Sequence, residues 1–178
     1  AISVMAAHLG AELEVINLGL VNDPGEFEKV SRWDLGPGTA NFVSQPAMND
    51  SQLAKSLDAG RRAAEKAAQT QSQLFIGGEM GIGNSTSASA LSCALLGLPP
   101  EDLVGPGTGL DSAGVKHKSD VISQALKHHE AVVRSAQPLM ILRHLGGFEI
   151  AGLIGAYVGC AQQGKPVLVD GFIASVAA

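Results

Sequence analysis

Short apolar segments that alternate with helical ones constrain the fold of this chain most strongly. Residues 12–20 ("ELEVINLGL"), 72–79 ("SQLFIGGE") and 165–172 ("KPVLVDGF") each contain an apolar run of strand length. Segments with helical periodicity separate them, and strands that are apolar on both faces are typical of a parallel sheet covered on both sides. The pattern therefore predicts an α/β fold with a mostly parallel sheet.

The segments between the strands predict the helices and two long loops. Gly and Pro are frequent in residues 22–48 and 99–114, which we expect to form loops, and the length of the first indicates a functional loop or one holding short irregular pieces. The predicted helices are residues 1–10 ending at Gly10, 50–70 capped by Asn49 or Ser51, 87–97, 115–132, 138–147 and 148–164. We predict a three-layer Rossmann-like domain, a central sheet flanked by helices, with residues 1–178 forming a single domain.

Composition excludes several classes of protein. Of the 178 residues 46% are hydrophobic and 16% charged, which indicates a well-packed globular chain. The net charge is −5 and no basic run occurs, so we expect no nucleic-acid partner. No apolar run reaches the roughly 18 residues of a membrane helix, and a cytoplasmic protein is the default expectation.

The cysteines and histidines give no sign of a metal site. Cys93 and Cys160 lie in small apolar surroundings, which favours buried reduced thiols over a disulfide. His128 and His129 are adjacent on a predicted helix and point in different directions, so we expect both on the surface. The sequence predicts neither a metal nor a cofactor.

Both ends of the chain look cut. It opens on "AISVMAAHLG" without an initiator Met and closes on the apolar segment "FIASVAA". We expect a piece of a longer protein. The alternative is that flanking residues were simply not resolved.

Two carboxylates follow predicted strands directly. Glu79 comes after Gly77-Gly78, and Asp170 follows the strand at 165–169. If these strands are parallel neighbours, both acids lie at the edge where ligands gather in such sheets. An alternative role for Glu79 is an ion pair with a loop cation, and Asp170 could instead cap the following helix.

A glycine-rich turn between strand and helix, residues 81–86 ("GIGNST"), predicts an anion site. Glycines let a ligand approach the backbone, and the first N–H groups of a helix favour phosphate. The candidate binding residues are Gly81, Gly83, Asn84, Ser85 and Thr86. The turn is neither a Walker loop nor a dinucleotide fingerprint. A plain helix cap by Asn84 or Ser85 is about equally compatible with the sequence.

A lysine is the candidate partner of that anion. Lys118 lies one helical turn beyond the glycine-rich loop "VGPGTGLD", from which its ammonium could reach the strand edge. The alternative is a solvated lysine, as we expect for Lys116. Glu149 follows Gly146-Gly147 and ranks below Asp170, since it could simply complement a helix dipole.

Taken in order, the motifs resemble the nicotinate-nucleotide–dimethylbenzimidazole phosphoribosyltransferase family. They are "GTANF", "GGEMGIGNSTSASAL", "VGPGTGLDSAGVKHK" and "LGGFEIAGLIGAYVGCAQQGKPVLVDGFIAS". The resemblance implies transfer of ribosyl phosphate from nicotinate mononucleotide to 5,6-dimethylbenzimidazole in cobalamin assembly, with inversion at the anomeric carbon. It implies no metal, and a homodimer.

The resemblance also implies roles for single residues. Glu79 matches the family's active-site acid in this loop, Lys118 a phosphate-holding lysine, and Asp170 the acid of the Asp-Gly-Phe strand end. Residues 81–86 match the nucleotide-binding turn, with Ser85 where Thr is usual. The family's general base is a glutamate beyond the point where this chain stops, so we expect the isolated chain to be nearly inactive. The alternatives are a non-catalytic phosphate- or nucleotide-binding module and a related transferase acting on phenolic acceptors.

Overall fold

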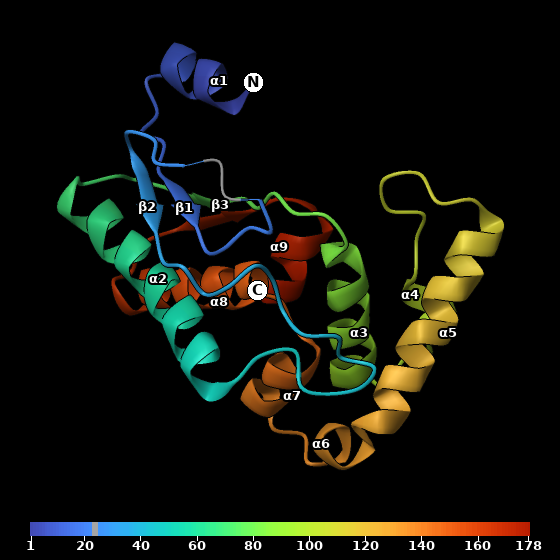
Figure 1. The fold of residues 1–178 in the computed structure, drawn as a ribbon. Helices are drawn as coiled ribbons and strands as arrows, with labels where there is room; N and C mark the ends of the chain where they lie inside the picture. The colour runs from blue at the N-terminus through green and yellow to red at the C-terminus, as the bar shows by residue number, and fades with distance from the viewer. Residues whose placement is uncertain (23–24) are drawn as a thin grey trace.

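The computed structural model describes residues 1–22 and 25–178, and within these ranges the chain has the predicted α/β architecture (Figure 1). Two pairs of strands form, and each pair is parallel. The strands are β1 (Val15–Asn17), β2 (Val30–Arg32), β3 (Phe75–Gly77) and β4 (Val167–Val169). β1 pairs with β2, and β3 pairs with β4 across a separation of some ninety residues in the sequence.

Helices account for most of the remaining structure. They are α1 (Ile2–Leu9), α2 (Asp50–Gln69), α3 (Asn84–Leu96), α4 (Pro100–Leu103), α5 (Ser112–His128), α6 (Glu130–Arg134), α7 (Pro138–Leu145), α8 (Phe148–Gln162) and α9 (Gly171–Ala177). Asn49 caps α2 as predicted, because its side chain accepts from Gln52 N while the Gln52 side chain accepts from Asn49 N. α3 lies between α5 on one side and α9 on the other (Figure 1).

Glycines bring α2 and α8 into close contact beside the sheets. A Cβ on Gly60 would overlap the carbonyl oxygen of Gly152, and a Cβ on Gly155 would overlap the carbonyl oxygen of Leu57. The two backbones therefore meet at a distance that only glycine permits. This packing holds α8, and with it β4, in a fixed position.

Three features differ from the expectations or were missed. β2 lies inside residues 22–48, where only a loop was expected, and α4 lies inside the second predicted loop. His129 is buried with 6% of its surface exposed, so the prediction that both histidines are on the surface is wrong for His129 and right for His128. The reason is that His129 lies four residues after Ala125 and seven after Ile122, so it continues the buried face of α5, and its Nε2 forms a hydrogen bond with the carbonyl oxygen of Phe42 at 2.8 Å.

The thiols and the strand-edge geometry are as predicted. Cys93 and Cys160 are free and buried. Gly77 pairs with Val169 in the parallel ladder, so the chain leaves both strands at one edge and carries Glu79 and Asp170 beyond it.

Candidate functional site

The turn after β3 leads into α3 without a side-chain cap. Gly83 is the N-cap residue with a φ of 86°, and no side chain bonds to the first N–H groups of the helix. Thr86 N bonds to Gly83 O at 3.0 Å, while the remaining first-turn N–H groups have no partner within the helix. The structure therefore does not have Asn84 or Ser85 as the cap, which was the alternative to an anion site.

Lys118 lies at this helix start, on the buried face of α5. Only 6% of the residue is exposed, and its Nζ donates to Ser85 Oγ at 2.9 Å and to the carbonyl of Gly105 at 3.4 Å. Burial lowers the pKa of the Lys118 ammonium. Among the described residues no carboxylate forms an ion pair with it.

The glycine-rich loop before α5 lies beside the hydroxyl of Ser85 and the ammonium of Lys118. Gly107 has a φ of 55°, and a Cβ there would lie 3.1 Å from Ser85 Oγ and 4.0 Å from Lys118 Nζ. A side chain at residue 107 would therefore crowd the Ser85 hydroxyl, and the positive φ also favours glycine at this position. The start of α3, the loop that contains Gly107 and the Lys118 side chain of α5 therefore meet at Ser85.

Glu79 lies on the other side of the same turn. Its Oε2 accepts a hydrogen bond from Asn84 Nδ2, and the residue is half-buried. Burial raises the pKa of the Glu79 carboxyl, and the bond from Asn84 opposes that effect. Asn84 therefore orients the acid rather than capping the helix.

Asp170 follows β4 at the strand edge, and among the described residues it forms no ion pair with the other predicted site residues. It is exposed, and although it occupies the N-cap position of α9 its side chain makes no capping hydrogen bond. The alternative interpretation, in which the Asp170 side chain caps α9, is therefore wrong.

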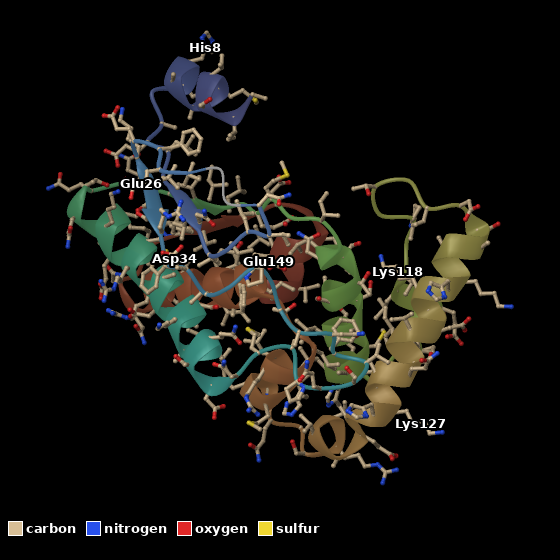
Figure 2. The ribbon with its side chains drawn as sticks, in the orientation of Figure 1. His8, Glu26, Asp34, Lys118, Lys127 and Glu149 are labelled. Atoms are coloured by element: carbon tan, nitrogen blue, oxygen red, sulfur yellow. The ribbon has the colours of Figure 1, made fainter. Side chains whose placement is uncertain are left out.

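Glu149, which the sequence analysis ranked below Asp170, is more buried than that residue. It stands in the first turn of α8, half-buried, and burial raises the pKa of its carboxyl, with the charge of Glu79 adding to the rise. Figure 2 shows Lys118 between α5 and α3 and Glu149 on the opposite side of α3. The Gly146-Gly147 pair before Glu149 was the signal available in the sequence.

The site has a cationic end and an acidic end. Lys118, Ser85 and the first N–H groups of α3 offer donors to an anion, while Glu79 and Glu149 offer acceptors to hydroxyls or to a cationic group. Within the described ranges no group of three or more metal-binding side chains occurs, and no helix is long and apolar enough to cross a bilayer.

Comparison with known proteins gives a consistent match. A phosphoribosyltransferase family model (DBI_PRT) matches residues 1–178. The chain is 56% identical to a Pseudomonas putida protein and 55% identical to a Xanthomonas oryzae protein, both named nicotinate-nucleotide–dimethylbenzimidazole phosphoribosyltransferase. Each match covers 100% of this chain and 50% of the relative, so the chain spans about half the length of these relatives.

Solved structures agree with the sequence relatives. CobT from Thermus thermophilus superposes with a TM-score of 0.87 at 32% identity, over 99% of this chain and 52% of that protein. A second structure from the same organism, described as the nicotinate-nucleotide–dimethylbenzimidazole phosphoribosyltransferase, gives 0.87 at 33% identity over 99% and 51%. These structures are similar to this chain in fold as well as in sequence.

Proposed function

The chain belongs to the DBI_PRT phosphoribosyltransferase family, and from this premise we propose that residues 1–178 form the nucleotide-binding core of a nicotinate-nucleotide–dimethylbenzimidazole phosphoribosyltransferase. The reaction moves ribosyl 5-phosphate from nicotinate mononucleotide to 5,6-dimethylbenzimidazole. Its products are α-ribazole 5′-phosphate and nicotinate, as cobalamin assembly requires. Residues 1–178 constitute a single domain in this proposal, and the main general base lies elsewhere in the parent enzyme.

One observation carries the proposal: a buried ammonium meets a helix N-terminus, and no carboxylate of the described part of the chain pairs with it. Lys118 is 6% exposed and bonds to neutral oxygens of Ser85 and Gly105. Burying a charge is costly unless an opposite charge compensates it. A phosphate at this position would offset that cost and would also pair with the free N–H groups of α3.

The turn of residues 81–86 supports the same assignment. The start of α3 is formed by Gly81, Gly83, Asn84, Ser85 and Thr86, and its N-cap residue Gly83 has no side chain to satisfy the first N–H groups. The hydroxyls of Ser85 and Thr86 add donors that can rotate toward a phosphate oxygen. The turn therefore binds the nucleotide through its phosphate.

The acidic end of the site serves the ribose. Cleavage of the N-glycosidic bond builds positive charge on the sugar, which a nearby carboxylate stabilises. Glu79 is oriented by Asn84, and Asp170 leaves β4 at the same edge of the sheet. Both act in support of the general base, and most of the rate comes from positioning the reactants.

Binding of nicotinate mononucleotide tests the proposal, because it does not need the general base. Isothermal titration calorimetry on residues 1–178 should detect binding, and Lys118→Ala should weaken it at least tenfold, as for loss of a charged hydrogen bond of about 1.5–3 kcal/mol. Lys118→Met keeps the apolar stem and guards against misfolding. Lys116→Ala on the exposed face of the same helix is the matched control. Unchanged affinity in both Lys118 variants would remove the lysine from the phosphate site.

The resemblance also supports two properties of the whole enzyme. We propose that it is a cytoplasmic homodimer. The exposed apolar side chains of α1, Ile2, Val4, Met5 and Leu9, are a surface that a second copy could cover. Light scattering after size exclusion measures the oligomeric state.

A further inference from the structure

A small pocket lies between the segment that precedes α2 and the last turn of α7. Its volume is about 300 Å³, and its wall is formed by Ala40, residues 45–49, Gln52 and Arg143. α7 packs against α3 near the end of α3 that is opposite its first turn (Figure 1). The pocket therefore shares no residue with the turn of residues 81–86 or with Lys118.

Backbone hydrogen bonds hold the wall of this pocket in place. Ala47 N donates to the carbonyl of His144 at 3.1 Å, and Met48 N donates to the carbonyl of Arg143 at 2.9 Å. Ala40 N closes the segment on itself by donating to the carbonyl of Ala47 at 2.9 Å. Ala47 and Met48 are each 1% exposed. The pocket is thus formed before any ligand arrives, as small-molecule sites usually are.

Arg143 brings hydrogen-bond donors to the pocket that the chain does not use. A guanidinium carries five N–H donors and no acceptor. The Arg143 side chain is 23% exposed, and its Nε is shielded from solvent and has no hydrogen-bond partner in residues 1–22 and 25–178. Because buried donors in folded proteins nearly always have a partner, this donor indicates an acceptor that the described part of the chain does not supply.

Asp50 balances the charge of Arg143 but is a replaceable partner. Its Oδ1 lies 2.7 Å from Arg143 Nε, yet the Nε–H group is not directed at it closely enough to form a hydrogen bond. The Asp50 side chain is 88% exposed, and an ion pair in contact with water contributes little to stability. A carboxylate inside the pocket can therefore take the place of Asp50 at small cost.

The other side chains of the wall select for a carboxylate on a small apolar body. The side chains of Asn49 and Gln52 are already occupied, since they form the capping box of α2. Gln45 is exposed at the rim and offers its amide N–H groups as a second set of donors. Ala40 and Pro46 present apolar surface, which an ion without an apolar body would leave uncovered.

We propose that this pocket binds a small monocarboxylate with an apolar body, of which an aromatic acid is the simplest example. The planar fork of Arg143 binds both oxygens of the carboxylate, Gln45 donates to one of them, and the body lies against Ala40 and Pro46. The site goes beyond the proposed function, because it requires neither the nucleotide nor the turn of residues 81–86.

Proton–nitrogen NMR with benzoate as the probe tests the proposal. The Nε–H signal of Arg143 should be observable because this group is shielded from solvent, and benzoate should shift it in a saturable way together with the backbone N–H signals of residues 45 and 47–49. Benzamide has the same shape without the charge and should bind roughly tenfold more weakly or worse. No saturable shift, or equal binding of benzamide, would overturn the proposal. Equal binding of inorganic phosphate would show a site for any anion and would contradict the selection for an apolar body.

Two variants should change benzoate affinity in opposite directions. Arg143→Lys keeps the charge but loses the fork, so it should weaken binding severalfold, whereas Asp50→Asn removes the competing carboxylate and should strengthen it. Arg134→Lys alters an exposed arginine that pairs with Glu130 on α6 and should leave the affinity unchanged. Asp50→Asn decides the question even if Arg143→Lys folds poorly, since an unchanged or weaker affinity in this variant would exclude competition for Arg143. Failure of the chain to bind nicotinate mononucleotide would refute the proposed function and leave these results intact.

Discussion

The ammonium of Lys118 donates a 2.9 Å hydrogen bond to the hydroxyl of Ser85, which joins α5 to the first turn of α3. The two residues lie 33 positions apart in the sequence, and within residues 1–22 and 25–178 neither has an acidic partner. The bond holds both donors at the N-terminus of α3 before any ligand arrives. Because these donor groups are already held in place, binding of a ligand costs little further side-chain conformational entropy.

Ser85→Ala should weaken binding of nicotinate mononucleotide less than Lys118→Ala does. The hydroxyl contributes one neutral hydrogen bond, worth about 0.5–1.5 kcal/mol, which corresponds to roughly a two- to twelvefold loss of affinity. Calorimetry measures the change, with Ser123→Ala on the exposed surface of α5 as control. A loss as large as that of Lys118→Ala would mean that the hydroxyl does more than donate one bond.

Gly155→Ala should destabilise the fold without touching the site. The new methyl would overlap the carbonyl oxygen of Leu57 and lie 2.8 Å from its carbonyl carbon, so α2 and α8 must separate. Overpacking of this kind costs about 1–3 kcal/mol in the free energy of unfolding, which urea denaturation measures. Gly38→Ala is the control, since its Cβ would meet nothing within 4 Å. Equal stability of the two variants would contradict the close packing of α2 and α8.

His129 should make the stability of the fold depend on pH. Burial lowers the pKa of its ring below the ordinary 6.5, an effect that the carbonyl of Phe42 opposes and that His144 and His128 reinforce. The unfolded chain therefore takes up a proton first as the pH falls. The contribution of His129 to the free energy of unfolding is fully present above about pH 6.5 and is lost as the pH drops below it.

Denaturation of His129→Gln at several pH values tests the direction of this pH dependence. The variant should be less stable than wild type near neutral pH, and its free energy of unfolding should fall less between about pH 8 and about pH 5.5. His8→Gln changes an exposed histidine on α1 that is not among the groups acting on His129, and it should keep the wild-type pH dependence. A wild-type pH dependence in His129→Gln as well would exclude His129 as its source.

The sequence predicted the elements whose signals are local. Gly10 ends α1, Asn49 caps α2, and the strands before Glu79 and Asp170 pair in parallel as expected. β2 escaped prediction because "VSR" carries no apolar alternation within a segment rich in Gly and Pro, and it forms only through pairing with β1. The strand conformation of that segment depends on its pairing with β1, which the local sequence does not reveal.

The burial of individual side chains was harder to predict than the positions of the helices and strands. Lys118 lies three residues after Val115 and four before Ile122, which is completely buried, so it shares the inward face of α5 although a lysine normally remains in solvent. His129 shares the same inward face, seven residues after Ile122, although its imidazole is polar. The partial burial of Glu149 depends on the path of α8 past β3, which no local pattern shows.

A crystal structure of this chain with nicotinate mononucleotide tests the central claim most directly. The account predicts the nucleotide phosphate within hydrogen-bonding distance of Lys118 Nζ and the N–H groups at the start of α3, with the ribose turned toward Glu79. A nucleotide bound elsewhere, with the turn of residues 81–86 unchanged and Lys118 still bonded only to Ser85 and Gly105, would contradict it.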